Sequence, residues 1–207
     1  MKDNKNKTLE TYNKIAEKFS ITRYKHFWVD EFDYYLKIIE GNKVLDIGCG
    51  AGRDASVFIK KRLDYTGIDA SDGMIKFAKL RNKKGKFKLM DFNKLDFPDN
   101  SFDGFWASAS FLHVPKNKIA KVLKEAKRVV KKNGVGFISI KEKVLVDEEV
   151  VRDKRYENMS RFFAYYKKRE FREILENLGF KIIKIMTKDY KGKDETKIRW
   201  LCYFVRK

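Results

Sequence analysis

The stretch Lys43-Val-Leu-Asp-Ile-Gly-Cys-Gly-Ala-Gly-Arg-Asp54 decides the fold of this chain. Its apolar start predicts a short buried strand, and the amphipathic segment after it predicts a helix. Gly48, Gly50 and Gly52 lie between the two, where glycine permits a sharp turn and the close approach of a ligand. A strand, a glycine loop and a helix in this order form half of a nucleotide-binding crossover unit, with helix amides facing the ligand. We therefore expect a nucleotide-like ligand at this loop.

The spacing of the glycines distinguishes two kinds of nucleotide loop. A dinucleotide loop reads G-x-G-x-x-G, which would place its last glycine where this chain has Arg53. The loop here reads G-x-G-x-G after an acidic residue, Asp46. It resembles motif I of the class I S-adenosylmethionine (SAM) dependent methyltransferases. The resemblance implies SAM as cofactor and a doubly wound, Rossmann-like α/β fold. Its seven-stranded sheet would be mostly parallel, with helices on both faces and the last strand antiparallel in a closing hairpin.

Two acidic residues at predicted strand ends extend the resemblance. Asp69 ends the predicted strand 65–69, 17 positions beyond Gly52. An acidic residue at about this distance binds ribose hydroxyls in nucleotide-binding folds. The alternative, a helix cap, is better served by Ser71 or Asp72. Asp91 lies in the third predicted strand, 87–92. The resemblance implies that Asp91 accepts a hydrogen bond from the adenine amino group, and that Phe92 contributes its backbone amide.

The resemblance also assigns roles within the glycine loop. The glycines would hold the methionine part of the cofactor, and Asp46 would orient the loop or the amino group. Arg53 would pair with a carboxylate of cofactor or substrate, or would lie on the surface. No metal site is expected. The predicted cofactor-binding residues are Tyr12, Asp46, Gly48, Cys49, Gly50, Gly52, Arg53, Asp69, Ala70, Met74, Asp91, Phe92 and Ala107.

The segment after the fourth predicted strand, 104–108, faces the transferred methyl group in this family. It lacks the Asp/Asn-Pro-Pro-Tyr, Pro-Cys and paired-glutamate signatures of DNA and protein-arginine methyltransferases. It resembles small-molecule members instead. His113 is a candidate general base for a substrate hydroxyl, or an orienting residue. Tyr166 is a second candidate catalytic residue.

The chain of 207 residues suits a single methyltransferase domain. We expect the helix at 116–132 to be closed by Asn133-Gly134, and residues 142–161 to be an aperiodic insertion. The predicted parts are an N-terminal helical lid at 1–40, a cofactor-binding core at 41–141, a substrate-cap insertion at 142–166, and a C-terminal helix with the closing hairpin at 167–207.

The acceptor is predicted to lie beneath a roof made by residues 142–166 and the N-terminal helix. Closed sites need a lid, and lids are inserted between core elements. Phe163, Tyr165 and Tyr166 would face Tyr12 and Phe19 across the acceptor. The alternative is that these aromatic residues fill the core and the insertion decorates the surface.

The formal net charge of +19 raises the question of a nucleic-acid substrate. Only 12 of the 48 basic residues are arginine, the residue on which specific phosphate recognition depends most. The lysine clusters at 60–62, 79–88 and 131–132 are predicted at the sheet edge opposite the ligand. We therefore expect methyl transfer to an O, N or S atom of a small molecule. Transfer or ribosomal RNA as substrate, and a SAM-binding regulatory domain without turnover, are the alternatives.

Location and partners are predicted from simple features. The two cysteines, Cys49 and Cys202, are too few for a disulfide framework and indicate a reducing compartment. No apolar run reaches membrane-spanning length, and the first residues lack the apolar part of a signal peptide. We expect a cytoplasmic protein without a membrane partner. The sequence does not indicate an oligomeric state.

Overall fold

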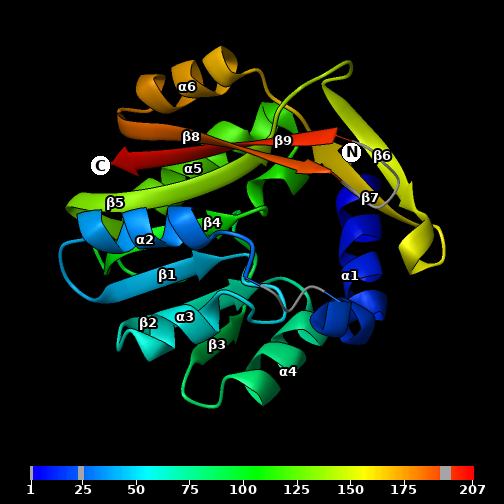
Figure 1. Ribbon diagram of the computed structural model, residues 1–207, viewed down its shortest axis with the longest axis horizontal. Helices are drawn as coiled ribbons and strands as arrows, with labels where there is room; N and C mark the ends of the chain where they lie inside the picture. The colour runs from blue at the N-terminus through cyan, green and yellow to red at the C-terminus, as the bar shows by residue number, and fades with distance from the viewer. Residues whose placement is uncertain (1, 23–25, 192–196) are drawn as a thin grey trace.

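A seven-stranded sheet in the order β3-β2-β1-β4-β5-β9-β8 runs through the computed structural model (Figure 1). Strands β1 to β5 pair in parallel, whereas β9 is antiparallel to both β5 and β8. This confirms the predicted Rossmann-like sheet with its closing hairpin. The strands are β1 (Lys43–Ile47), β2 (Asp64–Asp69), β3 (Lys86–Leu89), β4 (Phe102–Ser108), β5 (Val130–Lys141), β8 (Lys181–Lys191) and β9 (Lys197–Arg206). The structure describes residues 2–22, 26–191 and 197–207; Met1 and residues 23–25 of the predicted lid lie outside them.

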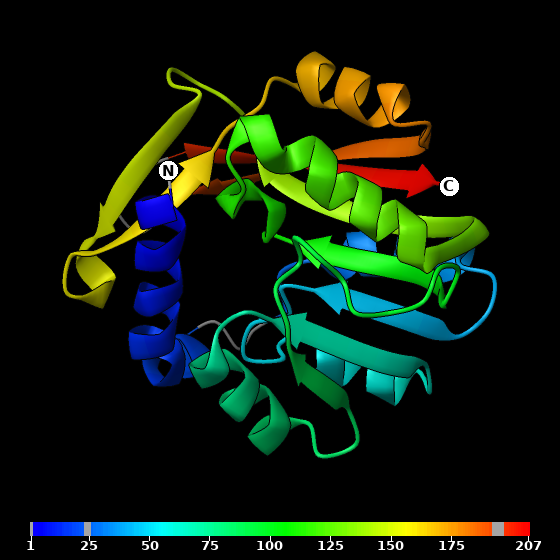
Figure 2. The ribbon, with the colours of Figure 1, turned by 180° about the vertical axis from the view of Figure 1, so that it is seen from behind.

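Helices cover both faces of the sheet because alternate strand residues point to opposite faces. In β4, Phe105 and Ala107 enter one apolar core while Trp106 enters the other. Helices α2 and α3 lie in front of the sheet in Figure 1, and α5 lies in front when it is seen from behind in Figure 2. The helices are α1 (Lys2–Thr22), α2 (Val29–Ile38), α3 (Ala55–Lys60), α4 (Asp72–Arg81), α5 (Lys116–Val129) and α6 (Lys168–Asn177), with short 3-10 turns at Phe111–His113 and Lys154–Tyr156.

The strand order reverses between β1 and β4, which are neighbours in the sheet. The connections that leave these two strands run in opposite directions, and a crevice opens at their carboxyl ends. Asp46 and Asp69, at the ends of β1 and β2, and Ser108, at the end of β4, therefore meet at one edge of the sheet.

A helix and a separate hairpin stand beyond this edge, as Figure 1 shows for α1, β6 (Glu148–Asp153) and β7 (Met159–Ala164). The hydroxyl of Thr11 donates to the Ser160 carbonyl (2.7 Å), and the Phe162 amide donates to the hydroxyl of Thr8 (2.9 Å). These bonds join α1 to β7. Among the described residues, no helix is long and apolar enough to cross a membrane.

Two local predictions were wrong. Helix α5 ends at Val129, and residues 130–134 already belong to β5 rather than to a helix and its cap. Val130 pairs with Phe102 of β4, and the Val130 carbonyl accepts from the Lys207 amine (2.7 Å). These distant partners outweigh the helical periodicity of the segment.

The insertion predicted as aperiodic contains the β6–β7 hairpin, whose strands pair antiparallel from Glu148↔Ala164 to Asp153↔Met159. Each strand has only six residues. Such short segments carry little periodicity, and their pairing is decided by the partner strand and by α1.

Candidate functional site

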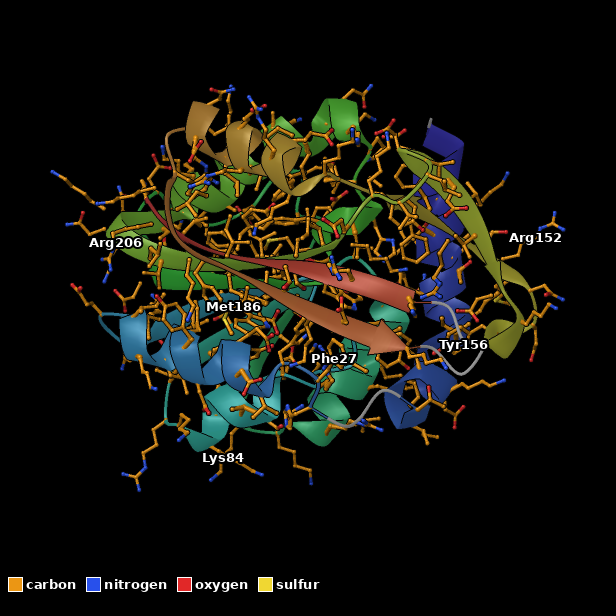
Figure 3. The ribbon with its side chains drawn as sticks, turned by 45° about the horizontal axis from the view of Figure 1, so that its top comes forward. Phe27, Lys84, Arg152, Tyr156, Met186 and Arg206 are labelled. Atoms are coloured by element: carbon orange, nitrogen blue, oxygen red, sulfur yellow. The ribbon has the colours of Figure 1, made fainter. Side chains whose placement is uncertain are left out.

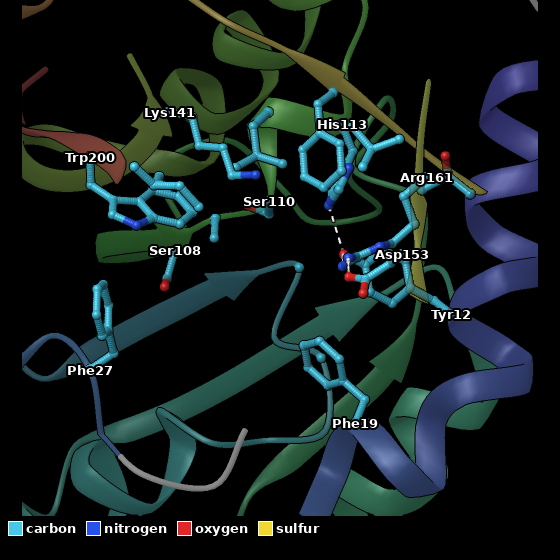
Figure 4. Close-up of a pocket in the computed structure, with 18 of the residues that line it drawn as sticks. Tyr12, Phe19, Phe27, Ser108, Ser110, His113, Lys141, Asp153, Arg161 and Trp200 are labelled. Atoms are coloured by element: carbon cyan, nitrogen blue, oxygen red, sulfur yellow. Dashed lines mark hydrogen bonds and ion pairs between the residues drawn. The ribbon is translucent and has the colours of Figure 1, made fainter. Parts of the chain in front are cut away.

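A large cavity of about 1270 Å³ opens at the carboxyl edge of the sheet (Figure 4). The glycine loop, the ends of β1, β2, β4 and β5, helix α1 and the β6–β7 hairpin all contribute to its walls. A pocket for one drug-sized ligand typically measures about 300–1,000 Å³. The cavity therefore has room for a cofactor and an acceptor side by side.

Asp69 anchors the glycine loop at the floor of this cavity. One of its carboxylate oxygens accepts from the Gly50 amide and the other from the Ser71 amide, both at 2.9 Å. Burial raises the pKa of Asp69, and the backbone donors oppose this change. Each oxygen keeps a second lone pair that can accept from a ribose hydroxyl. Of the two residues predicted for the cap of α4, Ser71 forms it by accepting from the Met74 amide, so Asp69 is available to a ligand.

The glycines hold the loop in a shape that leaves space for a ligand. Gly48 has φ +78°, and a Cβ there would lie 2.4 Å from the Cβ of Ser110. Gly50 has φ +54°, but its missing Cβ faces open space, with only a ring carbon of Phe19 at 4.0 Å. The open side of Gly50 borders the cavity, and this cradle fits the methionine part of SAM.

Asp46 is buried behind the loop, where it accepts a hydrogen bond from the Tyr65 hydroxyl (2.7 Å). Burial and the nearby Asp54 carboxylate raise the pKa of Asp46 well above its usual range. A cationic ligand group would stabilise the ionised form. The residue thus suits the ammonium group of SAM, the role that the resemblance gives it.

Arg53 is held in place by a buried partner that the sequence did not indicate. Its guanidinium forms two bonds to the Asp54 carboxylate (2.6 and 2.9 Å) and one to the Ser108 hydroxyl (3.1 Å). The indole of Trp106 also donates to Asp54 (3.0 Å). Burial would raise the pKa of Asp54, but Arg53 and Trp106 outweigh it and lower the pKa. Arg53 therefore presents a fixed cation to the cavity.

Tyr12 and His113 form a hydrogen-bonded pair between α1 and the turn after β4. The Nδ1 of His113 lies 2.6 Å from the Phe162 carbonyl oxygen, which only accepts, so Nδ1 carries the proton. Nε2 of the neutral ring is then an acceptor, and the Tyr12 hydroxyl donates to it (2.8 Å). Burial lowers the pKa of His113 to about 3 and raises the pKa of Tyr12. His113 therefore stays neutral and orients the Tyr12 hydroxyl (Figure 4).

Two cations from different elements enter the cavity wall next to this pair. Arg161 of β7 forms an ion pair with Asp153, and its Nη1 lies 3.4 Å from the Tyr12 oxygen. The amine of Lys141, at the end of β5, lies 4.0 Å from the centre of the Phe163 ring. Neither cation was among the predicted site residues.

The structure brings most of the predicted residues to the cavity. Those lining it are Tyr12, Asp46, Gly48, Cys49, Gly50, Arg53, Asp69, Ala70, Met74, Asp91, Phe92 and His113. Gly52 and Ala107 do not line it. Gly52 accepts from the Asn82 amide (2.9 Å) and packs on α4, and Ala107 is fully buried in the sheet core.

Tyr166 also lies away from the cavity. Its side chain is fully buried, packs against Phe171 of α6 (4.9 Å between ring centres) and has the Lys116 amine over its ring. Phe163 and Tyr165, on the other side of the chain, do line the cavity. Because side chains alternate along an extended segment, Tyr166 points to the opposite side. Its predicted catalytic position is therefore not supported by the geometry.

Most residues of the predicted basic clusters lie toward the far edge of the sheet, because they precede or begin strands whose other ends form the cavity; Arg81, within the 79–88 cluster, lines the cavity instead. Figure 3 shows Lys84, before β3, distant from Arg152 and Tyr156 of the hairpin region. Lys60, Lys61 and Arg62, before β2, are likewise not in the cavity lining.

Comparisons with known proteins agree with this fold and site. The methyltransferase domain family matches residues 45–138. The chain is 31% identical over 202 residues to an uncharacterized protein of Methanocaldococcus jannaschii, covering 90% of this chain and 89% of that one. It is 31% identical over 139 residues to the demethylmenaquinone methyltransferase of Thermotoga maritima, covering 63% of this chain and 59% of that enzyme. The chain thus spans about three fifths of the length of this curated enzyme.

A solved structure gives the same fold. The crystal structure of a SAM-dependent methyltransferase from Methanosarcina mazei superposes with a TM-score of 0.76 at 20% identity, covering 84% of this chain and 96% of that one. Through residues 45–138 the chain belongs to the methyltransferase domain family, and its fold is that of a SAM-dependent methyltransferase, whose cofactor is SAM.

Proposed function

We propose that this protein transfers the methyl group of SAM to an O, N or S atom of a small-molecule acceptor. One observation carries the proposal: the Asp69–Gly50 cradle and the Tyr12–His113 pair line the same cavity. SAM supplies a methyl group on a sulfonium, which is already a good leaving group. The protein is then required mainly to position the acceptor and exclude water. Positioning accounts for most of the rate enhancement in a methyl transfer of this kind.

The cofactor half of the cavity is proposed to bind SAM through the cradle. Asp69 accepts from the ribose hydroxyls, Asp91 from the adenine amino group, and the open side of Gly50 contacts the methionine part. Arg53, fixed by Asp54, pairs with the cofactor carboxylate. Asp46 faces the ammonium group. Gly52 and Ala107 support the loop and the sheet from behind.

The acceptor half is proposed to present its nucleophile to the Tyr12 hydroxyl. The acceptor atom forms a bond to the methyl carbon as the methyl–sulfur bond breaks, and S-adenosylhomocysteine (SAH) leaves. The acceptor proton passes to the Tyr12 oxygen while the Tyr12 hydroxyl proton moves along its hydrogen bond to Nε2 of His113, and the imidazolium then releases a proton to solvent. In the free protein His113 acts as a positioning residue, because its lowered pKa, about 3, makes it a weak base.

Three observations support a small acceptor. Helix α1 and residues 142–166 both contribute to the cavity lining, which supports the proposed roof. No lysine of the predicted clusters is among the described residues that line the cavity. The Thermotoga maritima relative is a demethylmenaquinone methyltransferase, which supports a small acceptor for this chain as well.

A radiolabelled methyl donor tests the proposal. The protein is incubated with labelled SAM and a metabolite panel, with transfer RNA and ribosomal RNA in parallel. Label on a small molecule is the expected result. Steady labelling of RNA with a strong salt dependence would establish the alternative substrate. Binding of SAH without label on any acceptor would favour a regulatory domain.

A further inference from the structure

The ring of Phe163 is the centre of a cluster of basic side chains in the acceptor half of the cavity. The Lys141 amine lies 4.0 Å from the ring centre, the Arg161 guanidinium carbon 5.3 Å, and the centre of the His113 ring 4.9 Å. The three come from β5, β7 and the turn after β4. An acceptor bound beside Phe163 would thus lie next to two cations and next to the Tyr12–His113 pair.

The wall around this cluster carries more positive than negative charge. Its cations are Lys141, Arg152, Lys154, Arg161, Lys197 and Arg199, and its carboxylates are Glu142, Glu149 and Asp153. Each carboxylate has a partner within the wall: Asp153 pairs with Arg161, Glu142 with Arg199 (3.8 Å), and Glu149 with the Tyr165 hydroxyl. Arg199 is also bound by Asp189 (2.7 Å), which lies outside the lining, so six cations are set against four carboxylates and the formal charge of this region is +2. A neutral acceptor would not offset this charge.

Three residues of the cavity lining carry a buried polar atom without a protein partner among the described residues: Trp28 (Nε1), Ser110 (hydroxyl) and Arg161 (Nε). Ser110 and Arg161, in the acceptor half, are 5% and 8% exposed. A buried donor without a partner costs about 1–3 kcal/mol, so such groups are usually satisfied by a ligand or water. In Figure 4 the Lys141 side chain extends toward Ser110, and Arg161 enters the cavity beside Tyr12. Ser110 and Arg161 therefore both belong to the cavity wall.

We propose that the methyl acceptor carries an oxyanion, a carboxylate or a phosphate, bound beside Phe163 by Lys141, Arg161 and Ser110. This inference rests on the proposed methyltransferase function and specifies its substrate class. The oxyanion accepts from the Lys141 amine, the Ser110 hydroxyl and the Arg161 guanidinium. The separate nucleophilic O–H, N–H or S–H group of the acceptor then lies against Tyr12.

The positive charges near the reacting atoms favour an anionic acceptor. The sulfonium of SAM adds a positive charge to a cavity that already holds Lys141 and Arg161, and an oxyanion neutralises part of the sum. Burial and then the charges of Arg161 and Lys141 lower the pKa of His113. A bound oxyanion offsets those two charges and makes the His113–Tyr12 pair more basic when the acceptor is present.

Calorimetry on the SAH-loaded protein tests the inference without turnover. The probes are inorganic phosphate, 4-hydroxybenzoate and the uncharged analogue 4-hydroxybenzamide. We expect at least one of the two oxyanions to bind more tightly than the amide. Comparison of the phosphate and 4-hydroxybenzoate titrations shows which anion is preferred. Lys141→Gln, which removes the charge, should weaken oxyanion binding by about tenfold or more, as expected for one charge-assisted hydrogen bond. It should leave the affinity for the amide unchanged.

Lys143→Gln is the matched control, because Lys143 pairs with Asp147 (2.9 Å) and does not line the cavity. Ser110→Ala provides a second variant that removes only the hydroxyl. Arg161→Gln is avoided because it would leave the buried Asp153 without its ion-pair partner. The inference is wrong if no oxyanion binds at millimolar concentration, or if Lys141→Gln weakens oxyanion binding no more than Lys143→Gln does. Failure of SAH itself to bind would instead overturn the proposed function.

Discussion

Replacement of Asp69 by asparagine separates the cofactor role of this residue from its role in the fold. The carboxylate accepts from two backbone amides, those of Gly50 and Ser71. Asparagine has the same size but a single acceptor oxygen, so one amide loses its partner. A hydrogen bond to a charged group contributes about 1.5–3 kcal/mol. We expect the free energy of unfolding to fall by about this amount, and the melting temperature by about 3–12 °C for a chain of this length.

Asp69→Asn should also weaken the binding of SAH, because the ribose hydroxyls lose a charged acceptor. A loss of about 1.5–3 kcal/mol corresponds to a rise of about 10- to 150-fold in the Kd for SAH. Isothermal titration calorimetry measures this, with NAD as a ligand that should give no signal. Asp72→Asn is the control, since Asp72 is exposed and does not line the cavity. An SAH affinity within about twofold of the wild type would remove Asp69 from the cofactor site.

Three further predictions test the Tyr12–His113 pair and the glycine loop. Tyr12→Phe should lower kcat by about 100-fold, the contribution of a positioned proton-transfer group, while SAH affinity changes little; an unchanged kcat would exclude the hydroxyl from the reaction. Between pH 6.5 and pH 5, the wild type should lose about 1.5–2 kcal/mol of unfolding free energy relative to His113→Gln. The reason is that unfolded His113 takes up a proton in this range, whereas folded His113, with its pKa lowered to about 3, does not. Urea denaturation measures this, and an equal loss of unfolding free energy between pH 6.5 and pH 5 in the two proteins would contradict the prediction. Gly50→Ala should abolish SAH binding and lower the unfolding free energy by about 1 kcal/mol, because its backbone is left-handed. Gly48→Ala should destabilise the protein more, because its Cβ would also collide with Ser110. Equal melting temperatures for the two variants would refute this difference.

Short-range features of the sequence were sufficient to predict the cofactor half of the site. The Ser71 cap is closed by Met74, three residues on, and the glycine loop is bound by Asp69 at the end of the next strand, 19 residues beyond Gly50. Parallel strands bring their carboxyl ends to one edge of the sheet, so residues at those ends converge once the strands are recognised. Asp91 was placed correctly in the lining, although β3 ends at Leu89 and Asp91 lies in the turn that follows.

Only the tertiary structure decided the acceptor half. Tyr12 and His113 are 101 residues apart, and their bond forms because α1 packs on the β6–β7 hairpin. Lys141 and Arg161 meet at Phe163 through two different sheets, and no local pattern predicts that contact. The sequence alone therefore determined the fold family and the cofactor loop, because backbone geometry and strand direction specify them locally. The surroundings of the acceptor depend on which distant segments pack together, and this packing is determined by the free energy of the whole fold rather than by local sequence.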